Sequence, residues 1–269
     1  MPLAVCATPI GNLDDVTLRV LEELREADVV LCEDTRVTRA LLERHEIRAR
    51  LLSYHGHNEA KRTAQLLPRL ETGERVALVS DAGLPGVSDP GARLIAAALD
   101  AGVPVTVLPG ASSVDTALVA SGLEAERYQF VGFLPRGDRA LRELWVELAR
   151  WPHAVVAFES PQRLPRTLAS LAEALPERRA AVCRELTKFY EEVVRGTGAE
   201  LAERFAEPPK GEIVLVLGPA EVSPESGDAG EAAAAVAELV ASGIPRRHAA
   251  EVVSRLTGVS RNTLYGASL

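Results

Sequence analysis

The chain has 269 residues, of which 47% are hydrophobic and 25% are charged, a composition typical of globular rather than disordered or membrane proteins. Its formal net charge of −8 argues against a chain that binds nucleic acid through overall attraction. No apolar run approaches the roughly 20 residues that cross a bilayer, and the first residues lack the basic segment of a signal peptide. We therefore expect a cytoplasmic location and no membrane partner.

The cysteines Cys6, Cys32 and Cys183 are few, odd in number and far apart, and no CxxC spacing is present. A disulfide framework and a structural zinc site are therefore not expected. A cysteine within an apolar run is usually a small core side chain, so these residues are assigned no chemistry.

The first hundred residues alternate short β-branched runs with helical periodicity. Asp14 and Asp15 are expected to cap a helix whose apolar residues recur every three positions: Leu18, Leu21, Leu24 and Ala27. Strands are predicted at residues 3–7, 29–32, 51–54, 76–80 and 105–108, and further helices at 61–70 and 92–101. Apolar strands that alternate with helices indicate a parallel sheet covered on both faces. The sequence thus predicts an α/β domain over residues 1–112.

The next hundred residues have more closely spaced strands. They are predicted at residues 130–133, 154–158, 180–184, 191–196 and 212–217. The last two lie close to their neighbours in sequence, which favours antiparallel pairing. We expect a second α/β domain with a mixed sheet over residues 113–220.

The last segment follows a turn-rich, weakly hydrophobic linker at residues 219–230. Residues 231–269 then read as helix, Gly243-Ile244-Pro245, helix, Gly258-Val259-Ser260 and a short helix. This is the outline of a helix-turn-helix-like module. From residue 240 to the end there are four arginines and one glutamate, and from 36 to 50 five arginines and two glutamates. Each of these arginine-rich runs could bind phosphates, or it could form a solvated helix face.

The loop after the fourth strand, residues 80–91, holds three glycines, two prolines and two aspartates. Prolines restrict φ and glycines permit positive φ, so the loop has a defined path with exposed backbone amides and carbonyls. Asp81 can accept hydrogen bonds from ribose hydroxyls or an ammonium group. Residues 89–91 are expected to do no more than cap the next helix.

The loop after the fifth strand, residues 108–113, leads into a helix that Ser112 or Ser113 can cap. Ligands of parallel α/β sheets bind beyond the carboxyl ends of the strands, so we expect these two loops, from adjacent strands, to converge on one crevice. The loop after the first strand has a single glycine, and no GxxxxGK[ST] sequence occurs. Nicotinamide binding and nucleoside triphosphate hydrolysis are therefore disfavoured.

Nine blocks in fixed order resemble the tetrapyrrole-methylase superfamily and, within it, the branch that methylates ribosomal RNA. The resemblance covers essentially the whole chain, helical module included. The blocks are TPIGNL (8–13), CEDTR (32–36), SYHGHNE (53–59), SDAGLP (80–85), PGASS (109–113), GFLP (132–135), FESP (158–161), RELTK (184–188) and GEIV (211–214). The first differs from the GxGPG of many superfamily members, which fits the RNA branch and argues against a corrinoid substrate.

The resemblance implies a methyltransferase that binds S-adenosyl-L-methionine between two α/β domains, usually as a homodimer. It implies 2′-O-methylation of a cytidine ribose in the decoding region of small-subunit rRNA, free or within the 30S subunit. The cofactor contacts that it implies fall on Pro9, Asp81, Leu84, Ser112, Ser113, Phe158, Leu186 and Glu212.

A ribose hydroxyl is a poor nucleophile, so its methylation calls for a base or a cation that lowers its pKa. The candidates are Asp34, Glu185 and Lys188, the lysine being useful as a base if its pKa is depressed. An ion pair with Arg36 is the alternative for Asp34. The residues expected to bind the RNA substrate are Arg36, Arg39, His57, Arg136 and Arg246. His55 and His57 could also hint at a metal, but no third ligand is evident, and none is expected.

Three classes of function are open to such a chain. The first is an rRNA ribose methyltransferase, which the basic module and the CEDTR and SYHGHNE blocks favour. The second is a methylase of a tetrapyrrole (precorrin or uroporphyrinogen), with the same fold and cofactor. The third is a non-enzymatic DNA-binding regulator, which would leave the two glycine-proline loops unexplained.

Overall fold

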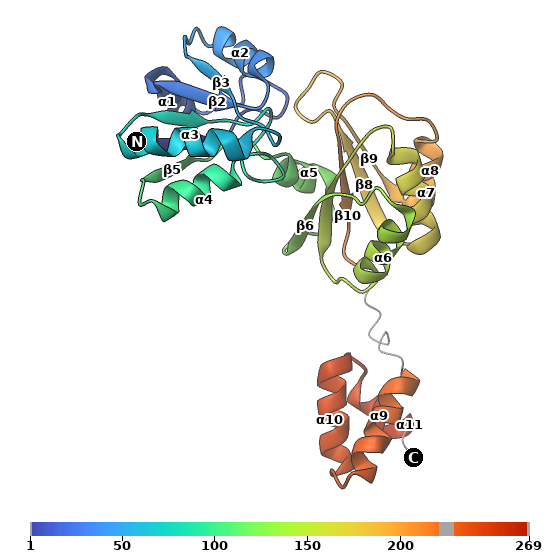
Figure 1. Cartoon of the computed structure of the whole chain (residues 1–269). Helices are drawn as coiled ribbons and strands as arrows, with labels where there is room; N and C mark the ends of the chain where they lie inside the picture. The colour runs from blue at the N-terminus through green and yellow to red at the C-terminus, as the bar shows by residue number, and fades with distance from the viewer. Residues whose placement is uncertain (1, 221–228, 268–269) are drawn as a thin grey trace.

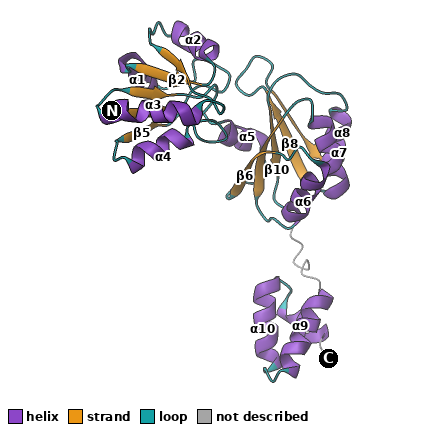
Figure 2. Cartoon of the chain, viewed as in Figure 1, coloured by secondary structure: helices purple, strands orange, loops and turns teal. Residues whose placement is uncertain are grey.

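A computed structural model describes residues 2–220 and 229–267. The chain forms two α/β domains that face one another and a separate group of three helices (Figure 1). The fold class predicted from the sequence is confirmed: one parallel sheet, one mixed sheet and a helical C-terminal module (Figure 2). No helix in the described ranges is long and apolar enough to span a membrane.

The first sheet is parallel throughout and has the order β3-β2-β4-β1-β5. Its strands are β1 (Leu3–Cys6), β2 (Val29–Cys32), β3 (Leu51–Ser53), β4 (Val76–Leu78) and β5 (Val105–Leu108). One face packs against α1 (Leu18–Glu26) and α2 (Thr35–Arg44). The other packs against α3 (Glu59–Glu71) and α4 (Ala92–Asp100). Since both faces are covered, β1, β2 and β4 are buried at every residue.

The start of α1 differs from the prediction. Its N-cap is Thr17, whose hydroxyl accepts the Val20 N–H at 3.2 Å, and neither Asp14 nor Asp15 caps it. Asp14 instead pairs with Arg44 at 2.8 Å. The prediction also placed Leu18 on the apolar face, but Leu18 is 83% exposed, and the buried face of the helix consists of Val20, Leu21 and Leu24.

The second sheet is mixed and has the order β6-β7-β10-β8-β9. Its strands are β6 (Tyr128–Phe133), β7 (Ala154–Glu159), β8 (Arg179–Arg184), β9 (Glu192–Thr197) and β10 (Ile213–Leu217). β6 and β7 are parallel, whereas β10 runs antiparallel to β7 and β8, and β8 antiparallel to β9. The predicted antiparallel pairs are therefore confirmed.

The two faces of this sheet are covered unequally. One packs against α6 (Asp138–Ala149), α7 (Leu164–Ala174) and α8 (Gly198–Arg204) around the buried Trp145. The other packs against a single helix, α5 (Ser113–Ser121), and against Ile10 from the loop after β1. The three cysteines are buried in these cores, as expected.

The C-terminal module has its own small core. Its helices are α9 (Ala229–Ala241), α10 (Arg246–Thr257) and α11 (Arg261–Ala267). Val236, Val253 and Leu264 pack together at its centre, and Gly258 ends α10 in the left-handed conformation. Most of the predicted linker lies outside the described residues, but residues 229 and 230 already belong to α9.

Candidate active site

A cavity of about 770 Å³ lies between the two α/β domains. Its walls are the loops after β1, β4 and β5 of the first domain, and β6, β7, β8 and the start of β10 in the second. The loops of the first domain follow the carboxyl ends of parallel strands, where α/β sheets bind ligands. The cavity is within the range of small-molecule and cofactor sites, about 300–1,000 Å³.

The loops after β4 and β5 both line the cavity, as predicted, but their strands are not adjacent. β1 lies between β4 and β5 in the sheet. The loop after β1 is consequently part of the site and is tied to the loop after β4. Thr8 N–H donates to Gly83 O at 2.8 Å, Gly83 N–H donates to Thr8 O at 3.1 Å, and the Thr8 hydroxyl donates to Ser80 O at 3.0 Å.

The loop after β4 contributes two carboxyl groups to the cavity, Asp81 and Asp89. Gly91 is the N-cap of α4, with a φ of 138° that a side chain would strain. Asp89, expected only to cap this helix, does not cap it. Burial raises the pKa of Asp89 to about 6, with a contribution from the negative charge of Glu33. Burial also raises the pKa of Asp81, whose Oδ1 accepts the Asp34 N–H at 3.0 Å.

The loop after β5 brings the start of α5 to the cavity. Ser112 is the N-cap, and its hydroxyl accepts the Asp115 N–H at 3.3 Å. Glycine is required at position 110 because a side chain would not fit: a Cβ there would lie 2.9 Å from the Ala7 Cβ. The N-terminus of α5 therefore faces the cavity with its partial positive charge.

The second domain supplies an aromatic wall. The Phe158 ring lies edge-on between Phe130 and Phe133, with centroid distances of 4.9 and 5.4 Å. Beside it Glu159 is fully buried, accepting hydrogen bonds from Thr167 at 2.6 Å and Arg163 at 3.1 Å. Glu159 thus holds the end of β7 in place, and the phenylalanines provide an apolar aromatic surface.

The loop after β8 brings Glu185, Leu186 and Lys188 to the rim. Glu185 has a φ of 52°, left-handed for a non-glycine residue. Lys188 Nζ donates to Glu185 Oε1 at 2.9 Å and to Glu212 Oε2 at 2.8 Å. Burial lowers the pKa of Lys188, but the hydrogen bonds that its ammonium group donates to Glu212 and Glu185 outweigh burial, so its pKa is raised. The hydrogen bond from Lys188 holds the pKa of Glu185 below its usual value.

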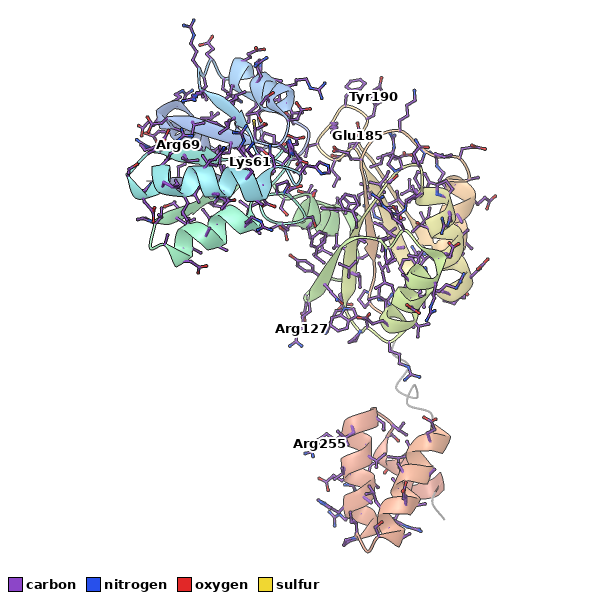
Figure 3. All side chains as sticks on the ribbon, viewed as in Figure 1. Lys61, Arg69, Arg127, Glu185, Tyr190 and Arg255 are labelled. Carbon is purple, nitrogen blue, oxygen red and sulfur yellow. The ribbon has the colours of Figure 1, made fainter. Side chains whose placement is uncertain are left out.

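The same loop touches the first domain at Gly11. A Cβ at Gly11 would lie 2.6 Å from Lys188 Cγ and 2.7 Å from Leu186 O. Asn12 N–H donates to the Thr187 hydroxyl at 3.0 Å. In Figure 3 Glu185 lies at the end of the second domain that faces the first. The two domains are thus in backbone-level contact at one side of the cavity.

A second cavity, of about 440 Å³, adjoins the first and shares Asp81 with it. Its other lining residues are Glu33, Asp34, Thr35, Ser53, His55 and His57. The Asp34 carboxylate pairs with Arg36 at 2.6 Å, and this hydrogen bond lowers the pKa of Asp34 to about 2. The ion pair considered as the alternative for Asp34 is therefore present. Among the described residues, no group of three or more His, Cys, Asp or Glu is arranged to hold a metal ion.

Seven of the eight residues predicted to contact the cofactor line the first cavity: Asp81, Leu84, Ser112, Ser113, Phe158, Leu186 and Glu212. Pro9 is buried and does not line it. Of the predicted substrate-binding residues, His57 lines the second cavity, and Arg36 and Arg39 are exposed on α2 beside it. Arg136 lies just before α6, and Arg246 begins α10 in the separate module, so the five are not brought together.

Several cavity residues were not predicted, among them Asp89, Asp115, Tyr128, Phe130 and Phe133. The phenylalanines read from the sequence as strand interior residues. A usable signal was present in the GFLP and FESP blocks, where an aromatic residue ends a strand shortly before a proline.

The fold and this interdomain cavity define a two-domain α/β protein of the methylase type. The sequence profile of the tetrapyrrole (corrin/porphyrin) methylases matches residues 2–202, and the chain belongs to this family. The chain is 45% identical to the "Ribosomal RNA small subunit methyltransferase I" of Mesorhizobium japonicum over 98% of this chain and 90% of that protein. It is 42% identical to the protein of the same name from Thermotoga maritima, over 80% of this chain and 97% of that protein.

A solved structure is also similar, that of uroporphyrin-III C-methyl transferase from Thermus thermophilus complexed with S-adenyl homocysteine. The sequence identity is 25% and the TM-score 0.56, over 80% of this chain and 96% of that chain. The two-domain core is thus common to a protein named for ribosomal RNA and one named for a tetrapyrrole.

Proposed function

We propose that this chain is an S-adenosylmethionine-dependent methyltransferase that methylates the 2′-oxygen of a cytidine ribose in small-subunit rRNA. The observation that carries the proposal is the 45% identity, over nearly the whole of both chains, to a relative named ribosomal RNA small subunit methyltransferase I. A tetrapyrrole substrate has weaker support, since the chain is only 25% identical to the uroporphyrin-III C-methyl transferase, over 80% of this chain.

The first cavity suits the proposed cofactor chemically. The cofactor has a flat adenine, ribose hydroxyls and a sulfonium cation. Phe158 and Leu186 offer apolar surface to the ring, and Asp81 and Glu212 offer carboxylates to the hydroxyls and the cation. The N-terminus of α5, at Ser112 and Ser113, suits a carboxylate. When bound, the cofactor supplies an electrophilic methyl group.

The acceptor hydroxyl needs help to lose its proton, and we propose Lys188 for that role. Lys188 has a raised pKa and two carboxylate partners, so it remains a cation at neutral pH. A cation beside the hydroxyl lowers its pKa, so that the proton can pass to solvent as the methyl group is transferred to the oxygen. Glu185 and Asp34, the other two candidates, have lowered pKa values, which makes each a weaker base. Asp34 is better suited to orienting Arg36 toward RNA phosphates.

The proposal is tested with purified protein and radiolabelled S-adenosylmethionine. Small-subunit rRNA or 30S subunits from a strain lacking the modification should be labelled, and digestion should locate the label on a cytidine ribose. Uroporphyrinogen serves as the competing acceptor. Labelling of uroporphyrinogen with none of RNA would overturn the proposal. Label on an RNA base would retain RNA as substrate and overturn the 2′-oxygen.

A further inference from the structure

Two large aromatic side chains stand exposed at the tip of the loop that joins β8 to β9. Phe189 is 92% exposed and Tyr190 69%. Their rings meet edge to face, with centroids 5.0 Å apart. They fill the centre of a turn closed by Glu191 N–H donating to Lys188 O at 3.1 Å. Turn centres usually hold small or polar residues, and rings this exposed add little to a core, so the pair has no evident role in folding.

The turn is held in place by its neighbours on both sides. Glu191 Oε2 accepts the Thr187 N–H at 2.6 Å, and the Thr187 hydroxyl accepts the Asn12 N–H from the first domain at 3.0 Å. Lys188, adjacent to Phe189, is fixed by two carboxylates. A surface held in this way loses little conformational entropy when a partner binds.

The pair lies beside the rim of the first cavity. Leu186, three residues before Phe189, lines that cavity, and Tyr190 lies at the end of the second domain that faces the first (Figure 3). The first domain carries the exposed side chains of Arg36 and Arg39 on α2, next to the adjoining second cavity. A strand of RNA reaching the cavities would therefore meet arginines on one domain and aromatic rings on the other.

We propose that Phe189 and Tyr190 form a stacking platform for an unpaired base next to the methylated nucleotide of the RNA. This inference rests on the proposed function. A nucleotide that enters a cavity leaves its neighbours without one stacking partner, and exposed aromatic rings replace that partner. Lys188, which precedes Phe189 in the sequence, is already bound to two carboxylates, so the tip is suited to a base rather than to a phosphate.

The test compares a double variant, Phe189→Leu with Tyr190→Leu, and a conservative one, Phe189→Tyr with Tyr190→Phe. Leucine keeps an apolar side chain at each position but removes the aromatic face on which a base would stack. We expect the leucine variant to bind unmodified 30S subunits about 5- to 150-fold more weakly, with KM raised and kcat nearly unchanged. The conservative variant and Val146→Ala, an exposed site on α6, should match the wild type, as should cofactor affinity in all four proteins.

The two readouts, 30S binding and methyl labelling, separate this inference from the function on which it rests. Leucine and wild-type proteins that bind 30S subunits equally would overturn the platform, whatever the labelling. Loss of self-association in the leucine variant with unchanged 30S affinity would assign the rings to a second copy and also overturn it. Wild-type protein that binds 30S subunits through the rings without labelling RNA would overturn the proposed function and retain the platform.

Discussion

Asp34 and Asp89 lie near the same two cavities, yet their pKa values are displaced in opposite directions. Arg36 hydrogen-bonds Asp34 and lowers its pKa to about 2, so Asp34 is ionised throughout the neutral range. Burial and the charge of Glu33 raise the pKa of Asp89 to about 6. Asp81, between them, also has a raised pKa because of burial. At neutral pH three carboxylates are thus crowded beside a half-buried space, and a cation bound there would be stabilised.

The first prediction concerns Asp81, which lines both cavities. Asp81→Asn keeps the shape and an oxygen to accept the Asp34 N–H, but removes the charge. Loss of a charge-assisted hydrogen bond should weaken S-adenosylmethionine binding roughly 10- to 100-fold, measured by calorimetry. Asp14→Asn, on an exposed ion pair with Arg44, is the control. Unchanged affinity in Asp81→Asn would remove Asp81 from the cofactor site.

The second prediction concerns the pH dependence that Asp89 contributes. Its folded pKa, about 6, lies above its ordinary value of 3.8, so the folded state holds this proton more tightly than the unfolded state. Its contribution to stability is therefore greatest below about pH 4 and is lost as the pH rises toward 6. Asp89→Asn should be more stable than wild type at pH 7.5, by about 1 kcal/mol after allowance for solvent screening.

Urea unfolding of both proteins at pH 4.5 and 7.5 measures this difference. The gap in unfolding free energy should shrink at the lower pH, where the wild-type carboxyl is protonated. A gap that is constant with pH would mean that Asp89 does not titrate in this window.

At the scale of elements, the loops after β1 and β8 form the contact that fixes one domain against the other. Gly11→Ala is predicted to separate them, because the new Cβ would lie 2.6 Å from Lys188 Cγ and 2.7 Å from Leu186 O. We expect a destabilisation of about 1–3 kcal/mol and weaker cofactor binding, measured by urea unfolding and calorimetry. Gly56→Ala, with no heavy atom within 4 Å, should change neither. Equal effects of the two substitutions would contradict the contact.

The strands were predictable because they read as short apolar runs. β2, which is buried at every residue, and the edge strand β5 both begin and end at the predicted residues. The strand order was not predictable, since β1 enters between β4 and β5 through packing between distant segments. The loop after β1, where Pro9 was expected to contact the cofactor, lines the cavity through Ile10 instead.

The predicted N-cap of α1 was wrong for a related reason, a contact with a segment that is distant in sequence. Two aspartates precede the helix and suit a cap, but Asp14 is taken by Arg44 from α2, which leaves the cap to Thr17. The prediction of the candidate site from the sequence was limited in a similar way. Cofactor candidates carried over from the family blocks mostly reached the cavity, whereas arginines chosen for charge alone, such as Arg136 and Arg246, lie in separate parts of the molecule.

At the scale of the whole molecule, we propose that the α5 face of the second sheet is the surface of a homodimer. A single helix about 10 Å wide covers roughly two strand widths of this five-stranded sheet. Val119 on α5 is 83% exposed. The opposite face carries three helices. The α5 face is therefore covered less completely by helices of the chain itself.

Val119→Lys should accordingly yield a monomer without lowering the thermal stability of the domain, because the side chain is already exposed. Sedimentation at micromolar concentration measures the change. Val146→Lys, on α6 of the opposite face, is the matched control and should leave the dimer intact. A wild-type protein that sediments as a monomer would overturn the dimer.

The helical module is predicted to anchor the RNA substrate without taking part in methyl transfer. The Thermotoga maritima relative is matched over 97% of its length by 80% of this chain, so about a fifth of this chain has no counterpart in that protein. Deleting residues 221–269 should leave cofactor affinity unchanged in calorimetry. It should weaken 30S binding about tenfold or more, since a tethered second contact adds avidity.

Substitution of basic side chains on α10 tests this prediction more specifically than deletion of the module. Arg255 projects outward from the helix (Figure 3), and Arg247 is exposed near its start. Arg247→Glu with Arg255→Glu keeps the module's core and should reproduce much of the loss of 30S affinity. The loss should be larger at low salt, because phosphate contacts release counterions. A truncated chain with full 30S affinity would assign the module to another partner, whereas a truncated chain that no longer binds the cofactor would place the module within the enzyme itself.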